Sequence, residues 1–195
     1  MPVEHGTLTL AVTSPVQSFI EPITLAEAKA FLRLPDYDPV DVEADAMVSD
    51  LITAAREQAE MYQGRDLVAK QWDLTLDYFP GGEILLRDPL ISVDLVKYKD
   101  SDGTETTLVA NTEYIVDTAR ALVMPPYGES WPTFTPWPSS AVTIRFTTSA
   151  GAVSQSILTG MKLLIMGWHS GQVPKEQASF AAMHLLGSWS RSHFA

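Results

Sequence analysis

Cysteine is absent from all 195 residues of the chain. Without thiols the protein cannot form disulfides, use a thiolate nucleophile or bind a metal through cysteine. This composition is compatible with a reducing cytoplasm. The length is sufficient for one domain, or for a helical domain with a β insertion, to bury a full core.

Basic residues are scarce. The chain has 13 Lys and Arg against 24 Asp and Glu, which gives a formal net charge of −11. Because proteins attract nucleic acid through clustered Lys and Arg, this balance argues against specific DNA binding. Two interpretations of the acidic charge remain: it keeps the surface soluble, or it lets a surface face DNA without adhering to it.

Long hydrophobic runs are also missing. The most apolar stretch, "ILTGMKLLIMGW", is too short to cross a bilayer and contains Lys162. The first 20 residues lack the basic start and continuous apolar core of a secretory signal. We therefore expect a soluble protein with no membrane partner.

No stretch of the sequence has the spacing of a catalytic or metal-binding motif. The four histidines, His5, His169, His184 and His193, do not pair at the i, i+4 spacing that places two metal ligands on one helix face. The acidic stretches "PDYDPVDVEAD" and "KDSDGTE" do not match an EF-hand loop, and glycine-rich phosphate loops and nucleophile elbows are missing. We expect no catalytic residue, cofactor or metal. A small cytosolic enzyme using His169 or His184 with a carboxylate remains a remote alternative.

Two helices are expected in the N-terminal part. In "ITLAEAKAFLRL", Thr24 and Glu27 have the spacing of a capping box, which predicts a helix start. After Pro35, Asp38 before Pro39 predicts the N-cap of a second, longer helix, and Gly64 predicts its end.

The C-terminal part again has helical periodicity. A helix after Gly151 is apolar nearly all round, which predicts burial on several sides, either at the centre of the protein or between subunits. A last helix is expected over residues 175–193, with Trp189 on its apolar face.

Between these helical segments the period changes to two. "QWDLTLDYF" alternates apolar and polar residues, and "DYFPGGEILLRDPL" resembles the tip of a β-hairpin. About six short strands are expected in all, with "DSDG" as a hairpin turn. The loop "MPPYGESWPTFTPWPSS" is rich in Pro and Trp, so its aromatic residues either plug a core edge or anchor a protein interface.

These patterns predict an α+β protein in which N- and C-terminal segments form a helical bundle around an inserted small antiparallel β-module. The expected organisation is an N-terminal arm over residues 1–22, helices over 23–66, a β insertion over 67–150 and helices over 151–195. Residues 23–195 are expected to form one structural domain.

Three successive motifs resemble the head–tail connector (adaptor) proteins of long-tailed bacteriophages, prophages and gene transfer agents. The first is the helix "TLAEAKAFLR", the second is "LITAAREQAEMYQGR", and the third is "QWDLTLDYFPGG". Later stretches, "PLISVDLVKYKDSDG" and "VTIRFTTSAG", also fit, so the resemblance covers roughly residues 22–168. After Trp168 the sequence "HSGQVPKEQ" departs from the pattern.

The resemblance implies a structural virion protein of the neck rather than an enzyme. Such adaptors assemble in the host bacterial cytoplasm as a ring, typically of about twelve copies, beneath the portal protein ring. They connect the capsid to neck or tail-completion proteins and continue the channel through which genomic DNA passes without specific binding. A tail-completion or neck stopper protein is the nearer alternative.

Two sets of candidate contact residues follow from this interpretation. Residues of the expected C-terminal helices are candidates for the oligomer or portal interface: Leu158, Met161, Leu164, Ile165, Trp168 and Trp189. Residues of the expected hairpin tip and of the Pro- and Trp-rich loop are candidates for tail-side docking: Phe79, Gly81, Gly82, Trp131, Phe134 and Trp137.

Overall fold

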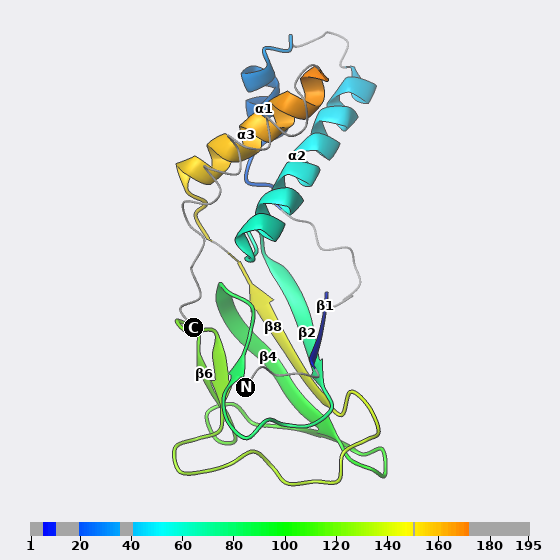
Figure 1. Ribbon diagram of the computed structural model, residues 1–195, viewed down its shortest axis with the longest axis vertical. Coiled ribbons are helices and arrows are strands. Elements are labelled where there is room, and N and C mark those ends of the chain that lie inside the picture. The colour runs from blue at the N-terminus through cyan, green and yellow to red at the C-terminus, as the bar shows by residue number, and fades with distance from the viewer. Residues whose placement is uncertain (1–5, 11–19, 36–40, 150, 172–195) are drawn as a thin grey trace. The chain divides into compact units, whose positions relative to one another are not determined.

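The computed structural model describes residues 6–10, 20–35, 41–149 and 151–171, and the chain divides into two compact units (Figure 1). The helical unit comprises residues 20–68 and the chain from 150 onward, and the β unit comprises residues 1–19 and 69–149. Helices and antiparallel sheets confirm the α+β class. Residues 6–10 of the expected N-terminal arm form a strand of the β unit. The single structural domain expected over residues 23–195 stays a prediction.

Both helices of the N-terminal part begin at side-chain caps. Helix α1 (Leu25–Leu32) starts at Thr24, whose hydroxyl accepts the backbone N–H of Glu27 at 3.2 Å, while the Glu27 carboxylate accepts the N–H of Thr24 at 2.9 Å. This confirms the capping box. Helix α2 (Val42–Gln63) ends at Gly64, which has φ of 66°, as the sequence predicted.

The start of α2 differs from the prediction. Its N-cap is Asp41, whose carboxylate accepts the N–H of Ala44 at 3.0 Å. Asp38, the predicted N-cap, lies outside the described residues. Several Asp residues in this stretch can cap a helix, and sequence spacing alone chose the wrong one.

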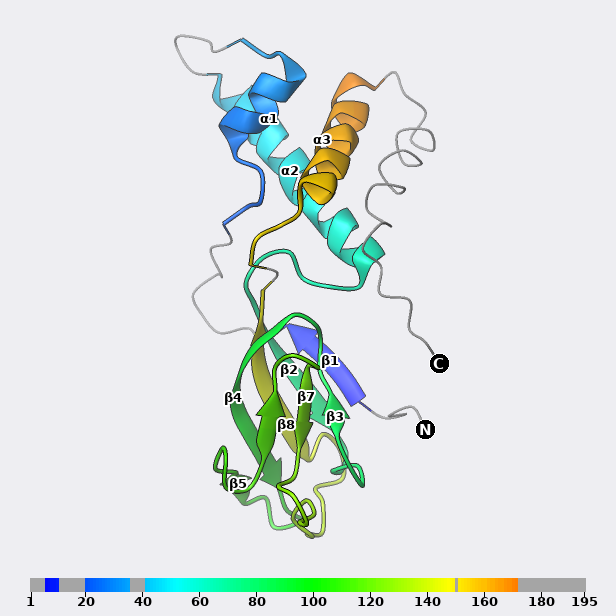
Figure 2. The same cartoon turned by 90° about the vertical axis from the view of Figure 1, so that its left-hand side faces the viewer.

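Helices α1 and α3 (Gln155–Ser170) both pack against α2 (Figure 2). Their core is apolar and consists of the buried residues Ile23, Ala28, Val48, Ile52, Ala55, Ala59, Leu67, Ile157, Met161, Leu164 and Ile165. Helix α3 is less completely covered than its apolar sequence suggested. Met166 is 41% exposed, and Leu158, Leu163 and Trp168 are only partly buried. Among the described residues of α3, Met166 is thus the most exposed large apolar side chain.

A buried ion cluster lies beside this core. The Arg56 guanidinium donates from Nη1 to Glu60 at 2.8 Å and from Nε to Glu21 at 3.0 Å. The second oxygen of Glu60 accepts the backbone N–H of Leu67 at 2.9 Å. Burial of Arg56 and Glu60 is tolerable because each charge has a partner and further hydrogen bonds. The cluster therefore attaches two segments to helix α2: the segment before α1, through Glu21, and the segment after α2, through the backbone of Leu67.

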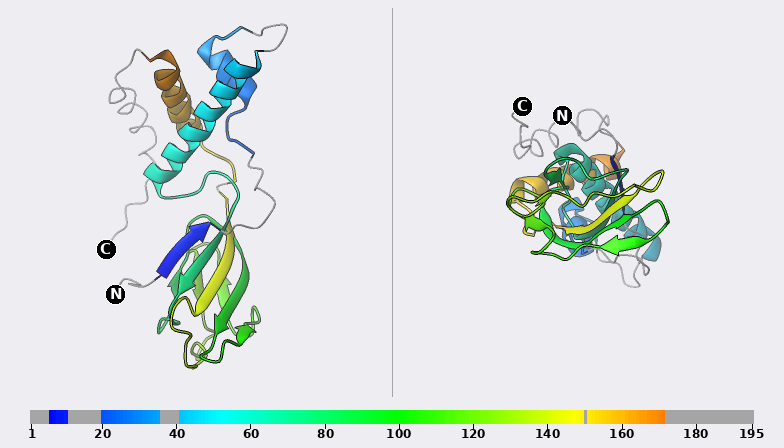
Figure 3. Two further views of the ribbon diagram at one scale, coloured as in Figure 1. Left: turned by 90° about the vertical axis from the view of Figure 1, so that its right-hand side faces the viewer. Right: turned by 90° about the horizontal axis from the view of Figure 1, so that it is seen from below.

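The β unit contains two antiparallel sheets. The larger has the order β1-β2-β8-β4-β5 and the smaller the order β3-β7-β6. Strand β1 lies at an edge of the larger sheet beside β2, as the blue strand in the left view of Figure 3 shows. The strands are β1 (Gly6–Leu10), β2 (Lys70–Leu76), β3 (Ile84–Leu85), β4 (Leu90–Lys99), β5 (Glu105–Thr107), β6 (Ile115–Asp117), β7 (Leu122–Met124) and β8 (Val142–Thr148).

The expected hairpin around Gly81 and Gly82 is wrong. Strand β2 pairs with β1 and β8, whereas β3 pairs with β7 in the other sheet. The "YFPGG" turn therefore carries the chain from one sheet to the other. Alternation identified β2 correctly but cannot tell which strand lies next to it. By contrast, β4 and β5 do form a hairpin around the turn Asp100–Gly103, as predicted.

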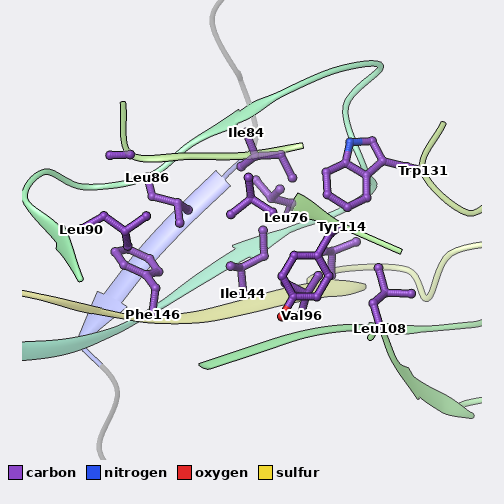
Figure 4. Packing of buried hydrophobic residues seen from close by; sticks show 13 residues of the cluster. Leu76, Ile84, Leu86, Leu90, Val96, Leu108, Tyr114, Trp131, Ile144 and Phe146 are labelled. Atoms are coloured by element: carbon purple, nitrogen blue, oxygen red, sulfur yellow. The ribbon is translucent and has the colours of Figure 1, made fainter. Parts of the chain in front are cut away.

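Apolar side chains from both sheets form the core of the β unit (Figure 4). Trp131 lies at one end of this cluster, while Leu90 and Phe146 lie at the other. The indole of Trp131 thus closes the core where the Pro- and Trp-rich loop crosses it. The buried members are Leu76, Ile84, Leu86, Leu90, Val96, Leu108, Tyr114, Ala121, Val123, Trp131, Val142, Ile144 and Phe146.

Candidate protein-docking site

A pocket opens on the β unit where two separately predicted segments meet. Its volume is about 300 Å³, and its walls come from the turn after β2 and from the Pro- and Trp-rich loop. The structure therefore brings the two halves of the predicted docking set together. The lining residues are Tyr78, Phe79, Pro80, Gly81, Ser130, Trp131, Pro132, Thr133, Phe134 and Pro136.

Stacked aromatic rings give this pocket its shape. Phe79 and Trp131 lie nearly parallel, at 5° and 4.7 Å between centroids, and Phe134 meets Phe79 edge-on at 6.0 Å. Tyr98 supports both phenylalanines from β4, at 6.1 Å from Phe79 and 4.4 Å from Phe134. Because each ring touches others, the pocket walls are formed before any partner binds.

One hydrogen bond locks the two segments together. The indole N–H of Trp131 donates to the backbone carbonyl of Gly82 at 2.6 Å. Trp131 is only 7% exposed, so of the two interpretations of this residue the core-edge plug applies. Its donor is already used, and the pocket therefore offers ring surface rather than an indole hydrogen bond.

Trp137 lies beside the pocket rather than in its wall. Its ring is 38% exposed and carries the Lys99 ammonium 4.3 Å from the centroid, a cation–π contact. The backbone N–H of Trp137 donates to the carbonyl of Lys99 at 3.1 Å, which holds the two residues together.

Two lysines at the end of β4, Lys97 and Lys99, differ in their charged partners. The neighbouring Lys97 donates to Glu105 at 2.8 Å, and this hydrogen bond lowers the pKa of the Glu105 carboxyl. Lys99, in contrast, makes no ion pair with a carboxylate in the described part of the chain. Its charge lies over Trp137 beside the pocket and also lowers the pKa of Glu105 without a direct contact.

The lining of the pocket offers aromatic surface and a few hydroxyl groups. Its lining contains hydroxyl groups at Tyr78, Ser130 and Thr133 but no carboxylate, histidine or lysine that could act as acid, base or nucleophile. Tyr78, which is 57% exposed, was not among the predicted docking residues. The alternation of β2 placed its ring on the expected apolar side, and that signal could have identified it.

The candidate oligomer-interface residues are divided by the structure. Met161, Leu164 and Ile165 are buried in the helical core of the chain itself, packed with residues of α2. This corrects their assignment as surface contacts, because helical periodicity does not distinguish an intramolecular core from an interface. Leu158 and Trp168 are partly buried on α3, and Trp189 lies outside the described residues.

The described residues give no support to the remote enzymatic alternative. His169 lies in the last turn of α3, and the other histidines lie outside the described part. Within that part, no three potential metal ligands cluster. None of the described helices combines the length and the hydrophobicity needed to span a membrane.

Comparison with known proteins places the fold among virion neck proteins. No protein-family model matches the chain, and no curated protein is significantly similar to it in sequence. A chain in the neck of an empty gene transfer agent particle, computed with C6 symmetry, superposes with a TM-score of 0.70 at 22% identity, covering 97% of both chains. A chain in the neck of the native particle, computed with C12 symmetry, gives 0.71 at 21% identity, again over 97% of both. A chain of the native gene transfer agent virion gives 0.70 at 20% identity over 96% of this chain and 97% of that one. At these identities the similarity establishes a shared fold.

Proposed function

We propose that this chain is a structural protein of a virion neck, a head–tail adaptor. In this role it docks as a ring of about twelve copies under the portal protein, joins the capsid to the tail and continues the DNA channel. The observation that carries the proposal is the fold similarity over nearly the whole chain to neck proteins, one of them in a particle neck computed with C12 symmetry. The three sequence motifs of the connector family support it independently.

The chemistry of the chain agrees with a non-enzymatic role. Its pocket lacks catalytic groups, and its formal net charge of −11 disfavours binding to DNA phosphates. A channel lined by acidic surface lets the genome slide during packaging and ejection without specific binding. The proposal places the protein in the virion neck, after assembly in the cytoplasm of the bacterial host.

Two surfaces are available for contacts in such a ring. The first is on α3, where Met166 is exposed and Leu158 and Trp168 are partly buried against the helical core. We assign this surface to the portal or to neighbouring copies. The second is the aromatic pocket of the β unit, which we assign to docking of another neck subunit.

Native mass spectrometry of the protein alone and mixed with its cognate portal ring tests the proposal. We expect a complex with about twelve copies per portal, the stoichiometry of a neck with twelvefold symmetry. The same measurement with tail-end components serves as the comparison. A chain that binds tail components but ignores the portal would be a tail-completion or neck stopper protein, and the adaptor proposal would be wrong.

A variant of α3 provides a matched test of the interface. Met166→Glu places a charge on this surface of α3, where it costs the folded monomer little because the side chain is already 41% exposed. We expect it to weaken portal binding. Met61→Glu, at a 71% exposed position on α2, is the control and should bind normally.

A further inference from the structure

Tyr127 projects from the β unit as an apolar knob. Its side chain is fully exposed, at 101% of the reference area. It follows Pro125 and Pro126 in a turn closed by the N–H of Glu129, which donates to the carbonyl of Pro126 at 3.0 Å. Gly128 has φ of 80°, a conformation that glycine adopts without strain. The turn thus holds the phenol ring in solvent.

The aromatic pocket matches a single inserted ring. Its volume of about 300 Å³ lies at the lower limit for ligand pockets, so a cofactor or drug-sized molecule does not fit well. The rings of Phe79 and Phe134 and the neighbouring prolines offer apolar surface on which an aromatic side chain packs favourably.

The charges beside the knob and the pocket are complementary. Glu129, two residues after Tyr127, makes no ion pair with a Lys or Arg in the described part of the chain. Lys99 rests on Trp137, next to the Pro136 wall of the pocket, and makes no ion pair in the described part of the chain, although its charge acts on Glu105 from a greater distance. Glu129 beside Tyr127 and Lys99 beside the pocket therefore carry opposite charges that can pair between two copies.

We propose that Tyr127 of one copy inserts into the aromatic pocket of the next copy, with Glu129 facing Lys99. The proposal rests on the ring-shaped oligomer of the proposed function. It names a second copy of the chain as the subunit that docks in the aromatic pocket. Tyr127 belongs to the same loop as Ser130 and Trp131 of the pocket wall, but the knob and the pocket are formed by different residues. In the proposed arrangement each copy gives its knob to one neighbour and receives a knob from the other, so the contact is heterologous. Repetition of a heterologous contact closes a ring when the rotation between copies permits it.

The absence of cysteine allows a direct test. Two variants are prepared, Tyr127→Cys and Gly81→Cys, and are mixed in equal amounts on the portal ring under mild oxidation. Gly81 lines the pocket and has no atom within 4 Å of where a Cβ would lie, so the substitution is tolerated. We expect disulfide-linked dimers from the mixture and none from either variant alone. Ile91→Cys, at a 54% exposed position of β4 that does not line the pocket, replaces Gly81→Cys in the control mixture and should give no dimers.

A charge exchange provides the second measurement. Tyr127→Ala should weaken ring formation by about tenfold or more, as expected for loss of a central aromatic contact. Glu129→Lys should also weaken the ring, and adding Lys99→Glu to the same chain should restore it. Thr118→Lys combined with Ala119→Lys, at two exposed positions of another turn of the β unit, changes the net charge by the same two units and serves as the control.

The outcomes separate this inference from the proposed function. A complete ring on the portal without cross-linking, and without an effect of Tyr127→Ala, overturns the knob-and-pocket contact and leaves the adaptor role intact. Absence of any ring on the portal refutes both. A Gly81→Cys chain that cross-links to a tail component instead of to Tyr127→Cys would assign the pocket to the tail and also overturn the inference.

Discussion

Replacing Glu60 by glutamine should destabilise the helical unit by about 3 kcal/mol, in the range found when one partner of a buried ion pair is removed. One oxygen of Glu60 accepts the Arg56 guanidinium at 2.8 Å and the other accepts the Leu67 N–H at 2.9 Å. A glutamine must direct its NH₂ group at one of these two donors. The Arg56 charge then loses a buried partner and retains its bond to Glu21 at the half-exposed edge of the cluster.

The same arginine provides a matched control. Glu57 lies 3.7 Å from the Arg56 guanidinium, but its side chain is 66% exposed. Glu57→Gln removes an equal charge from the same helix, and its effect should stay within about 0.5 kcal/mol because exposed ion pairs contribute little. Exchanging both buried partners, Arg56→Met with Glu60→Met, should cost less than Glu60→Gln, since the carboxylates that then lose Arg56, Glu21 and Glu57, are 25% and 66% exposed and can be hydrated.

Urea unfolding followed by far-ultraviolet circular dichroism measures these differences, because the helices dominate the signal. The difference in unfolding free energy between Glu60→Gln and Glu57→Gln is the decisive quantity. If the two variants unfold at the same urea concentration, the cluster is hydrated in solution and the reasoning from burial is refuted.

Three further predictions concern single contacts. Thr24→Ala should lower stability by about 1 kcal/mol at neutral pH through loss of the helix cap. Hydrogen bonds from Thr24 lower the pKa of Glu27 below its ordinary 4.5, so this contribution is present above that value and fades as the pH falls through the lowered pKa; urea midpoints of both proteins across acidic pH would reveal it. Gly64→Ala should cost about 1 kcal/mol from the left-handed backbone alone, since no atom lies near the added Cβ; equal midpoints would contradict this. Trp131→Phe leaves the Gly82 carbonyl without its donor and should cost about 1–3 kcal/mol, with loss of near-ultraviolet dichroism from the indole.

Local signals in the sequence predicted local structure well. The capping box at Thr24, the end of α2 at Gly64 and the β4–β5 hairpin each depend on residues only a few positions apart, and each is confirmed. The start of α2 was misplaced because neighbouring Asp residues compete for the same cap. The turn after β2 was misread because strand partners are fixed by burial across the whole sheet, which alternation within one strand does not encode.

The pocket could be predicted only in part. The aromatic residues of its two walls stood out in the sequence, but their contact joins Phe79 to Trp131, which are far apart in the chain. Tyr98 supports both from the middle of β4, where it resembles any other strand residue. Long-range contacts of this kind depend on the order of strands in the sheet. The burial of Met161 and its neighbours depends on how α3 packs against α2, which helical periodicity does not encode.

The helical unit is built from two segments of the chain that are separated in sequence by the β unit, and this order has a consequence for biosynthesis. Helix α2 leaves the ribosome with its apolar face, around Val48, Ile52 and Ala55, lacking the partner that α3 supplies. The whole β unit must be translated before that partner appears. During this interval the nascent chain carries an uncovered hydrophobic helix, the kind of surface that recruits chaperones or promotes aggregation. Expression yield should therefore respond more to substitutions that slow folding of the β unit than to equally destabilising changes in α3.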